Sequence, residues 1–378
     1  MQIEQTRWSQ ARGWTPEPPG KLGTKAQLVL LFGSPAPLKQ PGWQDDIAGA
    51  YPNAHRLGCS TAGEIYNTEV TDETLVATAI AFEHTGLHGA SLKLNEVSDS
   101  FQAGEQLARS LPQESLVHVL VLSDGQNVNG SALVAGLTQN LPTGVTLTGG
   151  LAGDGDRFRE TLVLWDAPPT PDTIAVLGLY GDRIKVGFGS LGGWDAFGPE
   201  RVVTRSSKNI LYELDGQPAL SLYKKYLGEH AKELPASGLL FPLSVRTSEG
   251  ESVVRTILGI NEAEHSLTFA GDLPEGTYAR LMKANFDRLI DGAMGAAQSS
   301  FEAIGNTSPD LALLISCVGR KLVLKQRIEE EVEGVREVLG QRTVLTGFYS
   351  YGEISPFTPS AKCELHNQTM TITTLSER

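Results

Sequence analysis

The segment Leu345-Thr346-Gly347-Phe348-Tyr349-Ser350-Tyr351-Gly352-Glu353-Ile354 joins a strand-like run to a glycine turn that ends in an acid. A second run, Gly58-Cys59-Ser60-Thr61-Ala62-Gly63-Glu64-Ile65, keeps both glycines, the glutamate and the isoleucine at the same spacing. A third, Leu147-Thr148-Gly149-Gly150-Leu151-Ala152-Gly153-Asp154, shares the Leu-Thr-Gly start and the terminal acid. The three turns therefore predict a repeated unit with glycine turns at strand ends, where open sheets place ligand sites.

Each turn is preceded by an apolar strand, a small-residue loop and a helical segment. The strands are Leu28–Phe32, Leu116–Leu122 and Leu311–Ile315, and unbroken apolar runs of this kind are typical of sheets covered on both faces. A strand near Leu92 and a helix opened by Asp99 match a strand near Leu267 and a helix from Lys283 to Phe301. This match predicts two related halves that arose by duplication.

Shorter β-rich segments separate these units and indicate antiparallel pairing. Examples are Leu75–Phe82, Ile174–Tyr180 and Ile184–Phe188. The predicted fold class is α/β of the mixed α+β kind, with two related domains whose mixed sheets are flanked by helices. In the third unit Ile328, Val332, Val335 and Leu339 form one apolar stripe, which predicts an amphipathic helix.

Composition limits the classes of function. The 378 residues include 44 acidic and 31 basic side chains, and a net charge of −13 argues against nucleic-acid binding. No apolar run of about 18 residues occurs and the N-terminus lacks a signal pattern, so we expect a cytoplasmic protein without membrane insertion. The three cysteines are expected to be reduced thiols. Residues 1–24, with the Pro-rich run Pro16–Gly20, are predicted to form an N-terminal arm.

Two motifs are set aside. Gly187–Gly192 fits G-x-G-x-x-G, but the following segment indicates another strand and not the helix that a dinucleotide site requires. Cys363 and His366 are three residues apart and Cys317 could join them at a metal, yet structural zinc usually has four ligands. Neither a dinucleotide nor a metal is therefore predicted.

The three turns, together with Ser316–Lys321 and Cys363–Thr369, resemble the FIST family of bacterial signalling proteins over nearly the whole chain. The resemblance places a FIST N domain at 25–206 and a FIST C domain at 207–378. It implies a sensory module for a small molecule such as an amino acid, with no cofactor required. It also implies a stand-alone sensor that signals to a separate partner such as a histidine kinase or a cyclic-di-GMP enzyme. Some stand-alone members bind haem and sense nitric oxide, so haem is the alternative.

The turn acids are the leading candidates for contact with a ligand. Glu64, Asp154 and Glu353 could bind an ammonium group while backbone N–H groups meet the other end of the ligand, or they could simply accept turn N–H bonds. Arg320 is placed to bind a carboxylate or phosphate, or to form a salt bridge with the Glu329–Glu331 cluster.

Tyr349 and Tyr351 would line the pocket or pack. The predicted ligand-binding set is Cys59, Ser60, Thr61, Glu64, Asp154, Cys317, Arg320, Tyr349, Tyr351, Glu353 and Asn367.

His366 is the candidate axial ligand under the haem alternative, with Asn367 orienting it. His55, His84, His88 and His118 are competing ligands. A third alternative is an enzyme in which the acids and thiols act as acid, base or nucleophile, although no residue pattern assigns a reaction.

Overall fold

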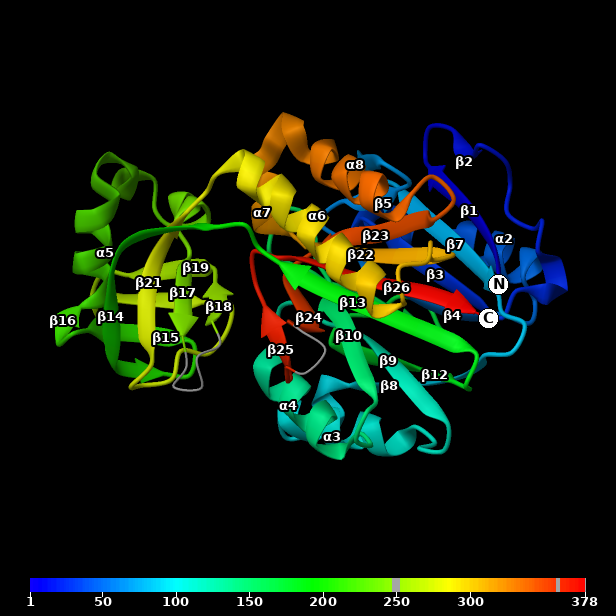
Figure 1. The fold of residues 1–378 in the computed structure, drawn as a ribbon, viewed down its shortest axis with the longest axis horizontal. Coiled ribbons are helices and arrows are strands. Elements are labelled where there is room, and N and C mark those ends of the chain that lie inside the picture. The colour runs from blue at the N-terminus through cyan, green and yellow to red at the C-terminus, as the bar shows by residue number, and fades with distance from the viewer. Residues whose placement is uncertain (247–251, 358–360, 378) are drawn as a thin grey trace.

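The computed structural model describes residues 1–246, 252–357 and 361–377. The chain forms a body of three six-stranded sheets and a smaller lobe that is inserted between two strands of the third sheet (Figure 1). Helices and strands of both pairing directions are present, so the predicted mixed α+β class is confirmed.

The body repeats one four-strand arrangement three times. In each unit two neighbouring strands are parallel. A third strand pairs antiparallel with the earlier of these two, and a fourth pairs antiparallel with the third. In sheet order the first unit has β4 (His55–Ser60), β3 (Leu28–Gly33), β7 (Leu75–Ala81) and β1 (Gln2–Ser9). The second has β10 (Thr146–Leu151), β9 (Leu116–Ser123), β12 (Thr173–Tyr180) and β8 (Gly86–Lys93). The third has β23 (Val344–Ser350), β22 (Leu311–Cys317), β26 (Met370–Glu377) and β13 (Ile184–Leu191).

The strand that follows each glycine turn leaves its own unit and joins the sheet of a neighbour. β5 (Glu64–Tyr66) pairs with β23, β11 (Val163–Trp165) pairs with β4, and β24 (Gly352–Pro356) pairs with β10. The exchange closes a ring in which every unit donates one strand and receives another. The prediction of two related halves therefore undercounts the repeat, which is threefold. Edge strands β2 (Gly13–Thr15), β6 (Glu69–Thr71) and β25 (Cys363–His366) complete the three sheets.

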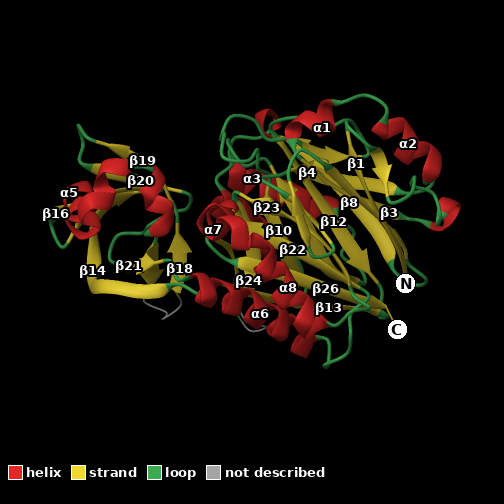
Figure 2. Cartoon of the chain, turned by 90° about the horizontal axis from the view of Figure 1, so that it is seen from above, coloured by secondary structure: helices red, strands yellow, loops and turns green. Residues whose placement is uncertain are grey.

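The three sheets share a central core, and helices cover their outer faces (Figure 2). Phe32, Leu122 and Ile315 occupy equivalent central positions in this core, one from each unit. The covering helices are α1 (Pro35–Lys39) and α2 (Trp43–Ala50), α3 (Ser100–Ser110) and α4 (Gly130–Asn140), and α6 (Phe286–Ala303), α7 (Val318–Leu324) and α8 (Ile328–Leu339). Val332, Val335 and Leu339 of α8 are buried, which confirms the predicted amphipathic helix.

The lobe is a twisted eight-stranded sheet with its own core around Leu211, Tyr223 and Leu267. Its elements are β14 (Asp195–Ser207), β15 (Ile210–Leu214), β16 (Gln217–Pro218), α5 (Ala219–Leu227), β17 (Leu243–Arg246), β18 (Ser252–Arg255), β19 (Ile257–Asn261), β20 (Ser266–Phe269) and β21 (Tyr278–Lys283). Short 3-10 helices are η1 (Gly23–Lys25), η2 (Leu94–Glu96), η3 (Gly228–Glu233), η4 (Ala236–Leu240) and η5 (Lys325–Arg327).

Two predictions from the sequence differ from the structure. The strand near Leu267 is β20 of the lobe, whereas the counterpart of β8 is β13, which the lobe insertion separates from the rest of its unit. The predicted N-terminal arm contains β1, which pairs with β7 from Gln2 to Trp8. Its half-exposed position near the sheet edge explains why the segment lacks a clear apolar alternation. The domain boundary at 206/207 stays a prediction, and the second and third sheets each contain strands from both sides of it.

Candidate functional site

The three glycine turns lie against one another at one end of the body. Ala62 N donates to Tyr349 O at 2.8 Å, and Tyr349 N donates to Gly63 O at 2.8 Å. The second turn joins them, because Gly153 N donates to the Ser60 carbonyl at 2.9 Å and the Leu151 carbonyl accepts from Tyr351 N at 3.2 Å. The strand exchange brings the turns together, since the strand that follows each turn joins the sheet of a neighbour.

The acids of the first and third turns are buried and hydrogen-bonded within their own units. Glu64 accepts from Ser34 Oγ at 2.8 Å and from Thr74 N at 3.1 Å. Glu353 accepts from Ser350 Oγ at 2.6 Å and from Thr369 Oγ1 at 2.9 Å. Burial raises the pKa of Glu64 to about 7 and that of Glu353 to about 8, although these hydrogen bonds favour ionisation.

Asp154 has the same structural role in the second turn. Its carboxylate accepts from the backbone N–H groups of Phe158, Arg159 and Glu160 at 2.8–3.0 Å, and the Tyr351 hydroxyl donates to it. Asp154 thus accepts backbone N–H bonds next to its turn, whereas Glu64 and Glu353 also bind hydroxyl and N–H groups from other segments of their units.

Arg320 forms a salt bridge with Glu331 in the interior. Its Nη2 donates to Glu331 Oε2 at 2.7 Å and also to the Leu289 carbonyl at 2.7 Å, while Nη1 donates to the Gly192 carbonyl at 2.5 Å. Tyr349 donates to the other oxygen of Glu331 at 2.7 Å. Arg320 and Tyr349 are therefore engaged with protein groups. Glu331, which the sequence reading kept within a surface-like acidic cluster, connects them.

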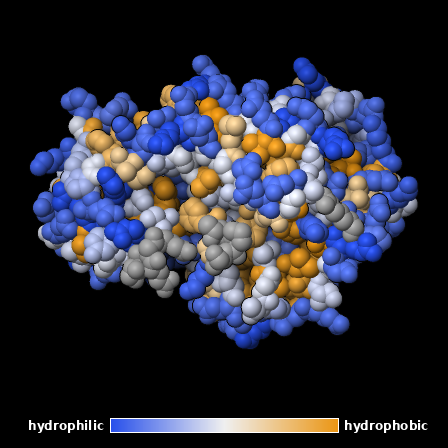
Figure 3. All heavy atoms as spheres, in the orientation of Figure 1, coloured by the Kyte–Doolittle hydropathy of each residue, from blue (hydrophilic) through white to orange (hydrophobic). Residues whose placement is uncertain are grey.

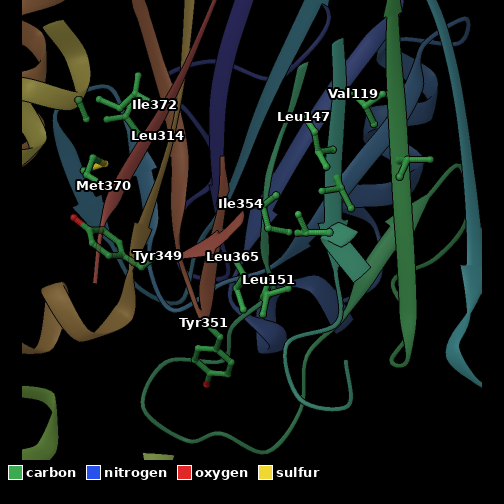
Figure 4. Close-up of a cluster of buried hydrophobic side chains, with 14 of the residues drawn as sticks. Val119, Leu147, Leu151, Leu314, Tyr349, Tyr351, Ile354, Leu365, Met370 and Ile372 are labelled. Carbon is green, nitrogen blue, oxygen red and sulfur yellow. The ribbon is translucent and has the colours of Figure 1, made fainter. Parts of the chain in front are cut away.

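The two tyrosines of the third turn point in different directions (Figure 4). Tyr349 reaches α8, whereas Tyr351 contacts Asp154 and stacks on Phe158 with ring centroids 4.4 Å apart. They do not face a common point.

The small residues and thiols of the predicted set lie in the interior. Ser60 Oγ accepts from Leu162 N at 2.8 Å, and Thr61 Oγ1 donates to Glu64 at 2.5 Å. Cys59 belongs to the central core, and Cys317 is buried at the end of β22. Burial raises the pKa of both thiols, so the neutral form is favoured, which disfavours a nucleophilic role.

A different group of polar residues has no visible structural role. Asn367 and Gln368, in the connection between β25 and β26, are both 0% exposed. Neither the oxygen nor the nitrogen of either side-chain amide has a hydrogen-bond partner among the described residues. Buried amides are normally paired, because each unpaired group costs about 1–3 kcal/mol. Four such atoms on adjacent residues therefore mark this connection as the candidate binding site.

The rest of the third unit surrounds this amide pair. The Gln368 amide lies against Gly319, where an added Cβ would be 2.4 Å from Nε2. Cys317 N donates to Thr369 O at 3.0 Å, and Glu353 also accepts from the backbone N–H of Thr369 at 3.2 Å. Of the predicted set, Cys317, Glu353 and Asn367 therefore meet here, while Cys59, Ser60, Thr61, Glu64 and Asp154 belong to the other turns.

Gln368 is the residue that the sequence reading missed. The polar run His366–Thr369 between two strands has the composition of a surface loop, and a single sequence gives no sign that it is buried. The one recognisable feature of this polar run is that it comes directly before an apolar strand, just as Thr74 comes directly before β7 in the first unit.

His366 lies in the interior, and its Nδ1 has no hydrogen-bond partner among the described residues. Its Nε2 lies 2.7 Å from the Ser355 carbonyl, and its buried ring meets Phe357 edge-on with centroids 4.3 Å apart. Burial lowers the pKa of His366 to about 4. An axial histidine needs a ring nitrogen directed at a space wide enough for a porphyrin. Haem therefore stays a prediction from the resemblance alone.

The competing histidine His118 is also buried, between Thr146 and Thr148, and burial lowers its pKa to about 3. His55 lies against Asp166 and stacks on Trp165. Over residues 1–246, 252–357 and 361–377, no cluster of three or more His, Cys, Asp or Glu side chains is arranged to hold a metal ion. In the same ranges no helix combines the length and apolar character needed to cross a membrane.

The fold defines a mixed α+β protein of three interlocked units with an inserted lobe, and its candidate site is a buried amide pair. Family models match the chain as a FIST N domain over residues 27–217 and a FIST C domain over residues 219–356. The chain therefore belongs to the FIST family of signal-transduction sensor proteins.

Two further similarities are weaker. The uncharacterised protein MJ1623 of Methanocaldococcus jannaschii is 24% identical over 204 residues, which cover 50% of this chain and 38% of that protein. The chain thus matches well under half of the length of that relative. A cyanuric acid hydrolase from A. caulinodans aligns over 78% of this chain and 99% of its own, with 9% identity and a TM-score of 0.18. At that score no common fold is inferred.

Proposed function

We propose that this chain is a cytoplasmic sensor that binds a small amino-acid-like ligand at Asn367 and Gln368. A separate signalling protein, such as a histidine kinase or a cyclic-di-GMP enzyme, receives the signal. The observation that carries the proposal is the set of four unpaired amide atoms on two adjacent residues, fully buried in the described structure. Membership of a sensory family supports the general role.

The chemistry of the two amides suits an amino-acid-like ligand. Each amide offers two N–H donors and one acceptor oxygen, so together they can hold a molecule that carries both ammonium and carboxylate groups. Glu353 lies opposite His366 in the β24–β25 pair, which places its carboxyl group near the same connection. Without a ligand, the unpaired buried amides cost free energy. A ligand that forms hydrogen bonds with them removes this cost, so binding is selective for molecules that can form such bonds.

The position of the site also offers a route for the signal. The Gln368 carbonyl accepts from Trp194 Nε1 at 2.8 Å, and Trp194 immediately precedes β14, where the lobe begins. The Leu365 carbonyl accepts from Arg255 Nη1 of the lobe at 2.7 Å. A ligand that favours one arrangement of residues 365–368 would therefore shift the lobe and the surface it presents to a partner.

The test replaces each amide by an apolar side chain of similar size. Asn367→Leu and Gln368→Met should raise the free energy of unfolding without ligand by about 1–3 kcal/mol, because a costly buried polar group is removed. Calorimetric titration with the twenty standard L-amino acids should give binding to the unsubstituted protein and none to either variant. Gln298→Met, at an exposed position of α6, is the matched control and should leave binding intact.

The proposal fails if no amino acid binds the unsubstituted protein, or if both variants bind as the control does. It also fails if both variants lose stability, since the amides would then be held by ordered water as part of the fold.

A further inference from the structure

A cavity of about 550 Å³ lies where the lobe meets the body. Its walls come from α4 and β25 of the body and from β17, β18 and the segment after β20 of the lobe. Figure 3 shows apolar surface along this junction. The volume is within the usual range for small-molecule sites, about 300–1,000 Å³.

Most of the lining is apolar. Val134 of α4, Val245 and Val253 of the lobe, Pro274, and Leu365 of β25 all face the cavity. A ligand seated here would touch both parts of the molecule at once, and its apolar body would leave water on binding.

Arg255 is the buried cation of this wall. It is 6% exposed, and its Nε and Nη1 donate to the carbonyls of Asp272 at 3.2 Å and Leu365 at 2.7 Å. Among the described residues, the hydrogen bonds given for its side chain are both to backbone carbonyls. Burial lowers the pKa of Arg255, and Glu364 and Asp272 oppose this only by longer-range attraction.

A buried cation held by neutral carbonyls is a costly arrangement that an anion would relieve. Neither of these carbonyl bonds uses Nη2, and Arg255 lines the cavity, so a ligand there can reach the guanidinium. The other charged residues of the lining are Lys362, Asp272 and Glu364, so the formal charges of the wall sum to zero and the preference for an anion depends on Arg255.

We propose that this cavity binds an organic monocarboxylate with an apolar body, whose carboxylate pairs with Arg255 and whose body lies against Val134, Val253 and Leu365. The site is separate from the amide pair. Because its walls belong to both parts, the bound molecule fixes the position of the lobe relative to the body.

Three probes that share one alkyl chain but differ in their head groups test whether the site requires a negative charge. In calorimetric titrations of the full chain at pH 7.5, octanoate should bind at least tenfold more tightly than octanol, and octylamine should bind more weakly still. Arg255→Met should remove the preference for octanoate while leaving octanol binding unchanged. Arg205→Met, on the exposed face of β14, is the control and should preserve the preference.

Two bulky substitutions test the location. Ala135→Trp and Thr138→Trp place an indole in the cavity from α4 and should abolish binding of both octanoate and octanol. Thermal unfolding checks that each variant folds. Two positions are used so that the test can still be made if one of the variants does not fold. Asn367→Leu should bind octanoate normally, which separates this site from the amino-acid site.

The inference is overturned if octanoate binds no better than octanol, or if a folded tryptophan variant binds octanoate as the unsubstituted protein does. Absence of octanoate binding to the unsubstituted protein overturns it as well.

Discussion

Buried polar residues of this protein fall into two groups with different uses. Glu64, Glu331 and Glu353 accept several hydrogen bonds each, so their main contribution is to hold turns and helices in place. Asn367 and Gln368 have amides without a hydrogen-bond partner within the described chain, and we propose that a ligand pairs them. The sequence identified the acids by their recurrence, but recurrence reflects a shared turn structure and does not by itself indicate a binding role.

Glu353 should make the protein less stable as pH rises. Its pKa in the folded protein, about 8, lies above the ordinary value of about 4.3, so the unfolded chain releases this proton first and stability falls between these two values. Glu353→Gln should flatten the decline in unfolding free energy between pH 7 and 8, measured by urea unfolding.

Titration of the histidines does not change the unfolding free energy in that pH range. The lowered pKa values of His118 and His366 make stability rise with pH only up to about 6.5. Parallel curves for Glu353→Gln and the unsubstituted protein would contradict the assignment.

Glu331 should be the most sensitive charged residue of the interior. Glu331→Gln leaves the buried Arg320 guanidinium without its anion and should cost about 3–5 kcal/mol of unfolding free energy. Glu337→Gln, on the exposed side of the same helix, should change stability by less than about 0.5 kcal/mol. Equal effects in denaturant unfolding would exclude a structural role for the Arg320–Glu331 pair.

Among the strands, three glycines occupy equivalent positions. Gly58, Gly149 and Gly347 lie opposite Leu31, Val121 and Leu314 in the parallel strand pairs. A Cβ at these glycines would lie 2.1, 1.9 and 1.8 Å from the facing carbonyl oxygen. The glycines at this place in the three turn motifs are therefore required by close contact between neighbouring strands.

Gly347→Ala should consequently destabilise the protein by about 3 kcal/mol or more, because backbone must move to admit the methyl group. Gly259→Ala, on strand β19 with no atom within 4 Å of the added Cβ, is the matched control and should be tolerated. Thermal unfolding of the two variants gives the comparison. An equally mild effect at both glycines would show that the strand pair can separate without cost.

At the same scale, prediction from sequence succeeded where a pattern is local. The apolar run at Leu311–Ile315 and the stripe on α8 identified a strand and a helix. The counterpart of β8 was misplaced because β13 and β22 belong to one unit but are separated in sequence by the whole lobe. The amide pair was only half identified, since Asn367 was a candidate and Gln368 was not. Burial of a polar loop depends on packing between distant segments.

For the molecule as a whole, the exchange of β5, β11 and β24 ties the three units into one ring. Opening any unit breaks pairing in a second sheet, so the body should unfold as one cooperative structure. In native-state hydrogen exchange, the central strands β3, β9 and β22 should share one opening free energy. The lobe, with a separate core, should open at a lower one. Exchange of one body unit well before the other two would contradict the interlocked arrangement.

The central claim is that Asn367 and Gln368 form the sensing site. The most direct measurement is the NMR spectrum of the side-chain amide groups in protein labelled with ¹⁵N at asparagine and glutamine, assigned with Asn367→Leu and Gln368→Met. With the amino acid that binds in calorimetry, the account predicts that these two signals shift and become protected from exchange with water while the Gln298 signal does not move. If the ligand binds and both signals stay in place, the site lies elsewhere and the account is contradicted.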